Sequence, residues 1–169
     1  MRAEDRKLRF ALAVFEPEVS LGPVVMALLQ DGIPLPRIGM ILHAANRDQI
    51  AIAGRQEAPA AASLHVLATD LQPISQGQTG VPILASSCLL HPWHSGWHLP
   101  SLWSSPSPTQ SAPALAPDLE RHVKSGSVII AAESLTPREQ WGCTRVLLQQ
   151  NSSSVLALEC SMPRHSTNG

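Results

Sequence analysis

The stretch His91–His98, with the sequence HPWHSGWH, holds the densest group of possible metal ligands in the chain. Its three histidines follow one another at i, i+3 and i+7, at positions His91, His94 and His98. On a helix this spacing places three imidazoles on one face, where zinc or copper could bind. Pro92 and Gly96 argue against a regular helix here, so metal or small-ligand binding through this stretch is kept as an alternative and no cofactor is predicted.

Three of the four tryptophans surround the same histidines, at positions Trp93, Trp97 and Trp103. Exposed indoles at such density are rare, so we expect the stretch to pack as a tryptophan-rich loop and to form the binding surface of the protein. The expected partner is the open face of a sheet, at small residues that leave room for rings: Ala11, Ala13, Gly39, Ala131 and Ala157.

A small enzyme is the second alternative, and it requires Cys88, His91 and Glu133 to converge in a pocket between this loop and the sheet. Cys143 and Cys160 are expected in the core. Glu133 and Glu159 are each expected at a strand end, where carboxylates are commonly solvated. No Gly-rich phosphate loop or nucleophile elbow occurs, so no catalytic residue is predicted and a non-enzymatic role is favoured.

The elements that must position these residues are clearest at the C-terminal end of the chain. Ser127–Glu133 and Val155–Cys160 are apolar runs rich in β-branched residues and are predicted strands. Between them, the Thr136–Glu139 sequence TPRE is a capping box with proline at the first helical position, which predicts a helix to about Gln150. The pattern is strand, helix, strand.

The N-terminal part repeats this pattern over residues 9–43. Arg9–Phe15 is a predicted strand, Ser20 is a candidate cap for a helix that ends at Asp31-Gly32, and Arg37–His43 is a second strand. Two such βαβ units predict an α+β fold with a four-stranded, ferredoxin-like sheet and its helices on one face. We expect a single domain over residues 1–169, with 44–117 as a long Pro/Ser/Trp-rich insert and linker, 118–161 as a helix plus the second unit, and 162–169 as a tail.

All four strands are apolar at consecutive positions, which is typical of a sheet buried on both faces. The two crossover helices cover only one face, so the insert is expected to cover the other. Within it, Glu57–Leu71 is a predicted short helix, Gln72–Gly80 a turn-rich loop and Ser104–Pro117 a flexible link. Asp118–Ser125 is a predicted helix with Gly126 at its C-cap.

Composition excludes several classes of protein. A net charge of -1 provides no electrostatic footprint for nucleic acid, and the strands of the second unit carry no aromatic residue on which RNA bases could stack. The first apolar run, Phe10–Phe15, is too short for a signal peptide, and no run approaches the roughly 20 residues that cross a bilayer. Three cysteines without a CxxC pair favour reduced thiols. We expect a cytoplasmic protein that binds neither nucleic acid nor membranes.

The second unit and the helix before it resemble the C-terminal part of bacterial general-stress-protein-like domains. The resemblance is carried by Leu119–Ile130 (LERHVKSGSVII), by Arg145–Leu148 (RVLL) and by Val155–Leu158 (VLAL). The family implies paired βαβ halves around a variable insert, which is often a glycine zipper and here is not. It implies no catalytic residues. The expected function is therefore a stress-associated or regulatory interaction module, with a homodimer as the first partner to test and any small-molecule ligand unknown.

Overall fold

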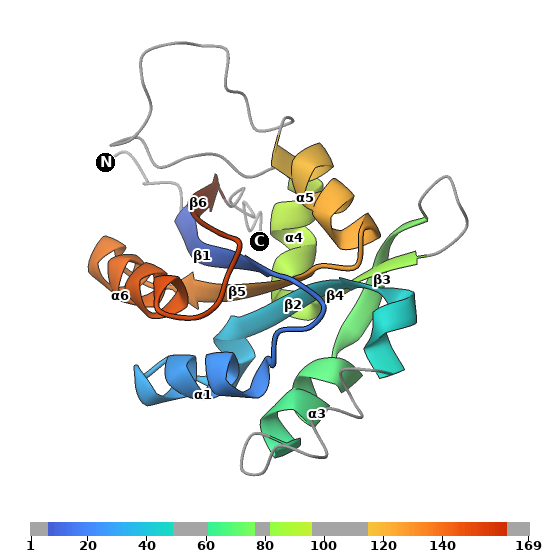
Figure 1. Ribbon diagram of the computed structural model, residues 1–169. Coiled ribbons are helices and arrows are strands. Elements are labelled where there is room, and N and C mark those ends of the chain that lie inside the picture. The colour runs from blue at the N-terminus through green and yellow to red at the C-terminus, as the bar shows by residue number, and fades with distance from the viewer. Residues whose placement is uncertain (1–6, 49–60, 77–81, 96–114, 162–169) are drawn as a thin grey trace, which may run out of the picture.

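One antiparallel sheet of six strands organises the part of the chain that the computed structural model describes, residues 7–48, 61–76, 82–95 and 115–161 (Figure 1). The strands follow in the order β3-β4-β2-β5-β1-β6. They are β1 (Lys7–Phe15), β2 (Ile38–His43), β3 (Leu71–Gln76), β4 (Pro82–Ser86), β5 (Val128–Ser134) and β6 (Ser154–Ser161). The helices are α1 (Gly22–Gln30), α3 (Ala61–Thr69), α4 (Ser87–Ser95), α5 (Leu115–Lys124) and α6 (Pro137–Leu148), with 3-10 turns η1 (Leu35–Arg37) and η2 (Ala44–Asn46).

The predicted four-stranded, ferredoxin-like sheet is wrong, because the insert adds two strands to it. The strands of the two expected units do lie side by side, in the order β2-β5-β1-β6, but β4 pairs with β2 and β3 pairs with β4. Residues 72–76 of the expected loop over Gln72–Gly80 and the last residue of the expected helix, Leu71, form β3 instead. Residues 77–80 lie outside the described residues. A short strand that contains a proline has little local preference for the extended state, and pairing with the rest of the sheet decides its structure.

Both faces of the sheet are buried, as the consecutive apolar positions predicted. On β1, alternate residues enter different cores: Phe10, Leu12 and Val14 point to one face, and Ala11, Ala13 and Phe15 to the other. The first face packs under α4 and α5, and the second under α1, α3 and α6 (Figure 1). The period of two along each strand produces this division.

The helix of the second unit begins as predicted. The side chain of Thr136 accepts a hydrogen bond from the backbone N–H of Glu139 at 3.1 Å, and Pro137 is the first helical residue. The Glu139 carboxylate pairs with the Arg37 guanidinium, which ties the first turn of α6 to η1. In the first unit, α1 begins at Gly22 with Leu21 at its N-cap, one residue after the predicted cap Ser20, and the Leu21 side chain makes no capping hydrogen bond.

The insert does supply part of the cover for the face opposite the crossover helices α1 and α6, through α4. Leu89 of α4 is fully buried in one core with Ile41 and Ile129, and α5 adds Leu119 and Val123 to the same core. The α5 helix ends as predicted, with Gly126 at a φ of +102°. It begins at Leu115, inside the expected flexible link; the remainder of Ser104–Pro117 lies outside the described residues.

Candidate interaction surface

The histidine–tryptophan stretch begins on a helix, although Pro92 and Gly96 predicted none. α4 runs to Ser95 with Pro92 inside it. Asp70 receives hydrogen bonds from the backbone N–H of Ser87 at 3.2 Å and from its hydroxyl at 2.9 Å, which caps the first turn. Pro92 has no backbone N–H and so removes one hydrogen bond from the helix. The cap at Ser87 and the burial of Leu89 compensate for this loss.

The predicted binding residues fall mostly outside the described part of the chain. Trp97, His98 and Trp103 lie in the range 96–114, and the described side chains of α4 end at Pro92, before Trp93 and His94. His91 is half-buried. Within the described ranges, no group of three or more His, Cys, Asp or Glu side chains is placed to hold a metal ion.

The small residues expected to seat the tryptophans do not share a face. Gly39 and Ala131 are register partners on the face under α4, whereas Ala11, Ala13 and Ala157 lie on the face of α1 and α6. A Cβ atom at Gly39 would meet Cys88 Sγ at 2.8 Å and Leu89 Cδ1 at 2.9 Å. The space above Gly39 is therefore filled by the first turn of α4.

Cys88 and Glu133, two of the three residues of the enzyme hypothesis, do approach one another on the α4 face. Burial, together with the smaller effect of the nearby carboxylates of Glu133 and Asp70, raises the pKa of the Cys88 thiol to about 12. A cysteine nucleophile needs a thiolate, which nearby cations or a helix N-terminus stabilise. Cys88 does lie in the first turn of α4, but burial and the two nearby carboxylates outweigh this effect on its pKa. The thiol stays protonated near neutral pH, so this arrangement does not support nucleophilic catalysis.

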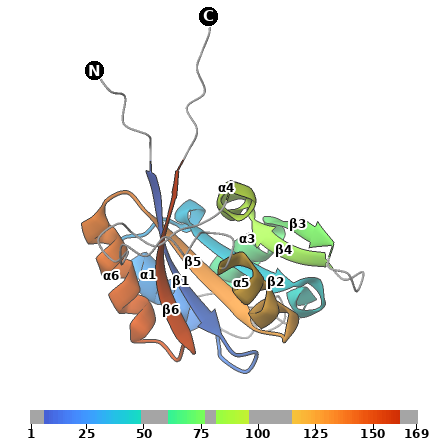
Figure 2. The same ribbon diagram turned by 90° about the horizontal axis from the view of Figure 1, so that it is seen from above.

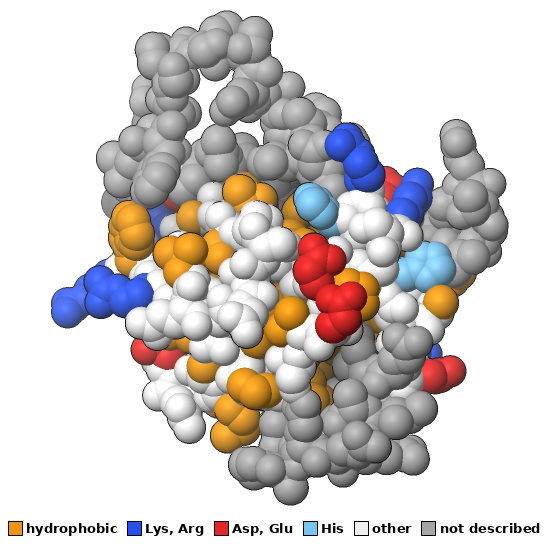
Figure 3. Space-filling model, in the orientation of Figure 1, with side chains coloured by type: hydrophobic (Ala, Val, Ile, Leu, Met, Phe, Trp, Pro, Cys, Tyr) orange, Lys and Arg blue, Asp and Glu red, His pale blue; other side chains and the backbone are white. Residues whose placement is uncertain are grey.

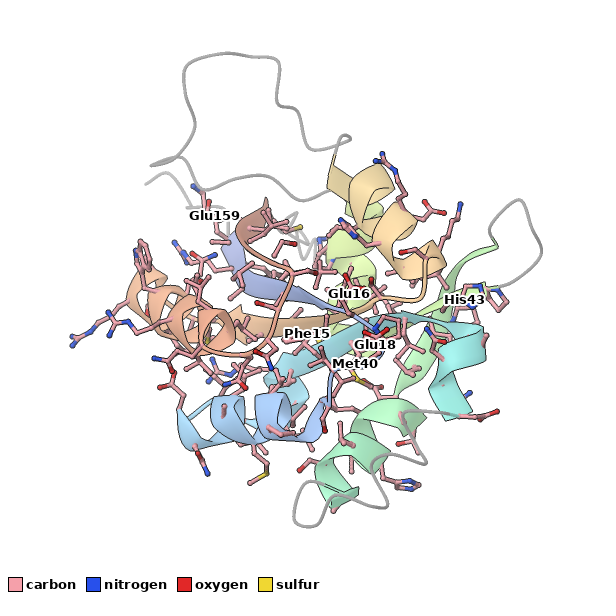
Figure 4. All side chains as sticks on the ribbon, in the orientation of Figure 1. Phe15, Glu16, Glu18, Met40, His43 and Glu159 are labelled. Carbon is pink, nitrogen blue, oxygen red and sulfur yellow. The ribbon has the colours of Figure 1, made fainter. Side chains whose placement is uncertain are left out.

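The two carboxylates Glu133 and Glu159 are not placed to act together. Glu133 is the register partner of Phe10 and Glu159 that of Arg9, so the two carboxylates lie on opposite faces of the sheet. Glu159 lies 3.7 Å from Arg9 Nε and 3.9 Å from Lys7 Nζ. Figure 4 shows it near the end of β6, away from Glu16 and Glu18.

Cys143 and Cys160 are buried, as predicted for core residues. Burial raises the pKa of both thiols, and the Ser134 hydroxyl donates to Cys143 Sγ at 3.6 Å. All three cysteines of the chain lie within the described residues, and they carry thiols rather than a disulfide.

Among the described residues, the most exposed large apolar side chains lie on and beside α6, a feature that the sequence did not lead us to predict. Trp141 is 56% exposed and Leu148 is 62% exposed, and Leu135, just before the helix, is 59% exposed. Seven residues separate Trp141 from Leu148, which places them within about 20° of each other around the helix. We call these two residues the α6 flank. The sequence does contain a signal for this surface: Trp141 and Leu148 are seven residues apart on the predicted helix, and each comes one residue after a buried residue, Gln140 or Leu147.

The α6 flank faces away from α1 and toward the β6 side of the sheet. The opposite side of α6 meets α1: a Cβ at Gly142 would lie 3.4 Å from Asp31 Oδ2, and Val146 packs on the α1 core. At about 100° per residue, the flank lies about 130° around the helix from those two positions. Figure 2 shows α6 on the same side of the molecule as β6, and Figure 3 shows hydrophobic atoms at the surface over α6.

α6 is held in place from beneath by a buried amide. Gln140 is 6% exposed, and its Nε2 donates to the carbonyl oxygens of Phe10 at 2.9 Å and Leu158 at 3.1 Å. These carbonyls belong to β1 and β6, so one side chain ties the helix to both strands. The α6 flank is therefore displayed on a fixed helix.

Comparison with known proteins adds no further evidence on function. No family model matches the chain, and neither the curated proteins nor the solved structures contain a match. Among the described helices, none combines the length and the apolar character that crossing a membrane requires.

Proposed function

We propose that this protein is a non-enzymatic interaction module that binds a protein partner through the α6 flank. The observation that supports the proposal is the exposure of Trp141 and Leu148 together on one side of α6, whereas Cys143, Val146 and Leu147 of the same helix pack on the core. Single exposed apolar residues are common on monomers, but tryptophan is enriched among the residues that dominate binding energy. Val66 on α3 is 50% exposed and is an example of such a single exposed apolar residue.

A stress-associated or regulatory role and a cytoplasmic location are part of this proposal. The role comes from the resemblance of the second unit to general-stress-protein-like domains. The location is supported by the three cysteines, which carry thiols rather than a disulfide, as is usual for proteins of a reducing compartment.

The test compares partner capture by three forms of the tagged full-length chain: wild type, the double variant Trp141→Ala/Leu148→Lys, and Val66→Lys. Lysine at position 148 is at the last helical residue, where a cation is favourable to the helix dipole, so the double variant should fold. We expect at least one stoichiometric partner, another protein or a second copy, to be lost from the double variant and kept by Val66→Lys. The same captured proteins on all three forms would contradict the proposal.

A further inference from the structure

The outer edge of β6 lies on the same side of the molecule as the α6 flank. β6 pairs with β1 on one side, and no described strand pairs with its other side. The Val14 carbonyl accepts from the N–H of Ser153 at 2.8 Å, so even-numbered residues of β1 direct their backbone groups toward β6. Their partners on β6 are also even-numbered, so the N–H and C=O groups of Val155 and Ala157 point outward.

The two edges of the sheet differ in how they resist pairing with another strand. β3, at the other edge, contains Pro73 and an irregular register between Pro73 and Ser75, and both features hinder the addition of a strand. β6 (SVLALECS) contains no proline or lysine and is eight residues long. Its one charged residue, Glu159, is 8% exposed and lies beside Arg9. The β6 edge is therefore suited to pairing and the β3 edge is not.

We propose that a second copy of this chain occupies the α6 flank, in a two-fold symmetric dimer in which β6 pairs antiparallel with β6 of the partner. This inference rests on the proposed interaction function and names the partner. An antiparallel edge is complementary to itself about a two-fold axis, and such isologous contacts are the commonest in soluble homo-oligomers. The same axis that joins the strands brings the two α6 flanks face to face.

The distance between the two α6 helices in this dimer favours large side chains on the α6 flank. α6 packs mainly over β1, one strand in from the edge. With strands about 4.8 Å apart, the α6 axis lies about 7 Å from the two-fold axis, and the two α6 axes about 14 Å apart. Helices in direct contact pack at about 8–10 Å, so a gap remains that small residues would leave open. Trp141 and Leu148 have the size to fill it.

The register of the pairing follows from the position of α6 along β6. Gln140 lies over Leu158, and α6 runs back along the strand toward Val155, which packs on the same core as Leu147. The midpoint of Trp141 and Leu148 lies about 7 Å along the helix from Gln140, which is about two strand residues from Leu158. The two-fold axis then passes Leu156, and Trp141 faces Leu148 of the partner.

In this register Val155 and Ala157 exchange backbone hydrogen bonds with Ala157 and Val155 of the second copy. Leu156 faces its own symmetry mate as a non-hydrogen-bonded pair, with Cα atoms about 4.5 Å apart. That distance is within the range that a disulfide spans. A cysteine at this position is thus a specific probe of both the edge and the register.

The first experiment measures the mass of the purified full-length chain by sedimentation equilibrium over a concentration series. We expect a dimer whose dissociation constant rises about tenfold or more in Trp141→Ala and in Leu148→Lys, as for truncated central interface residues, and is unchanged in Val66→Lys. Ala157→Pro removes an outward N–H without breaking a β1–β6 bond and should also give monomer. Circular dichroism of each variant confirms that it is folded.

The second experiment tests the register by mild oxidation of Leu156→Cys. We expect a covalent dimer, while the wild type and a Val66→Cys control remain single chains on a non-reducing gel. A wild-type chain that is monomeric at every concentration would overturn the inference, as would a dimer insensitive to Trp141, Leu148 and Ala157. If the chain is monomeric but the α6 variants lose a different protein in the capture experiment, the interaction function stands and the second copy is the wrong partner.

Discussion

Gly39 is the position where the packing of α4 on the sheet can be tested most directly, with the substitution Gly39→Ala. The added Cβ would lie 2.8 Å from Cys88 Sγ, 2.9 Å from Leu89 Cδ1 and 3.0 Å from Leu89 Cγ. Overpacking of a core by a methyl group costs about 1–3 kcal/mol, and loss of backbone freedom in the unfolded chain returns about 0.4–1 kcal/mol. We expect the free energy of unfolding to fall by about 1–2 kcal/mol, measured by urea denaturation.

Gly142→Ala provides the matched control, because the same substitution should have the opposite sign there. Its Cβ would approach Asp31 Oδ2 only to 3.4 Å, and alanine is favoured over glycine inside a helix by about 0.5–1 kcal/mol. Adding Cys88→Ala to Gly39→Ala removes the closest atom and should recover part of the loss. If Gly39→Ala is as stable as the wild type, α4 does not pack on β2 as described. The assignment of Leu89 to one core with Ile41 and Ile129 is then wrong.

Three further perturbations test the cap, the titration and the buried amide. Thr136→Ala should lower the free energy of unfolding by about 1 kcal/mol, because the N-cap bond to the first turn of α6 is lost; Thr136→Ser should restore most of it. Burial raises the pKa of the Cys88 thiol from 9.0 to about 12, so the folded state keeps a proton that the unfolded state loses, and stability should fall as pH rises from 9 toward 12. Cys88→Ala should reduce this slope by up to about 1.4 kcal/mol per pH unit; equal slopes would show that the thiol is not buried. Gln140→Met should leave the Phe10 and Leu158 carbonyls without this donor and cost about 1–3 kcal/mol, with faster hydrogen exchange in β6; unchanged exchange would argue against the bridge.

The elements with strong local signals were predictable from the sequence. The N-cap at Thr136 forms as predicted, because a capping threonine three residues before a glutamate needs no tertiary contact to be favourable. The sheet buried on both faces is confirmed, because only such a sheet accepts consecutive apolar residues along each strand. Burial of Cys143 on α6 and of Cys160 on β6 is also confirmed.

The insert was predicted poorly because its elements depend on distant partners. β3 contains Pro73 and forms by pairing with β4, and β4 forms by pairing with β2, more than 30 residues earlier in the sequence. α4 forms despite Pro92, because Asp70 caps it and Leu89 enters the core. Local propensity is weak at each of these positions, so contacts that are distant in sequence decide the structure.

The candidate surface shows the same division between local and distant information. The sequence by itself determined that a helix begins at Thr136, and that Trp141 and Leu148 share one side of it, because both follow from residues within a few turns. Only the tertiary structure decided that this side is exposed and faces β6, because that depends on α1 packing against the opposite flank and on Gln140 bridging β1 and β6. A helix has several possible faces, and its neighbours in space select the one that remains at the surface.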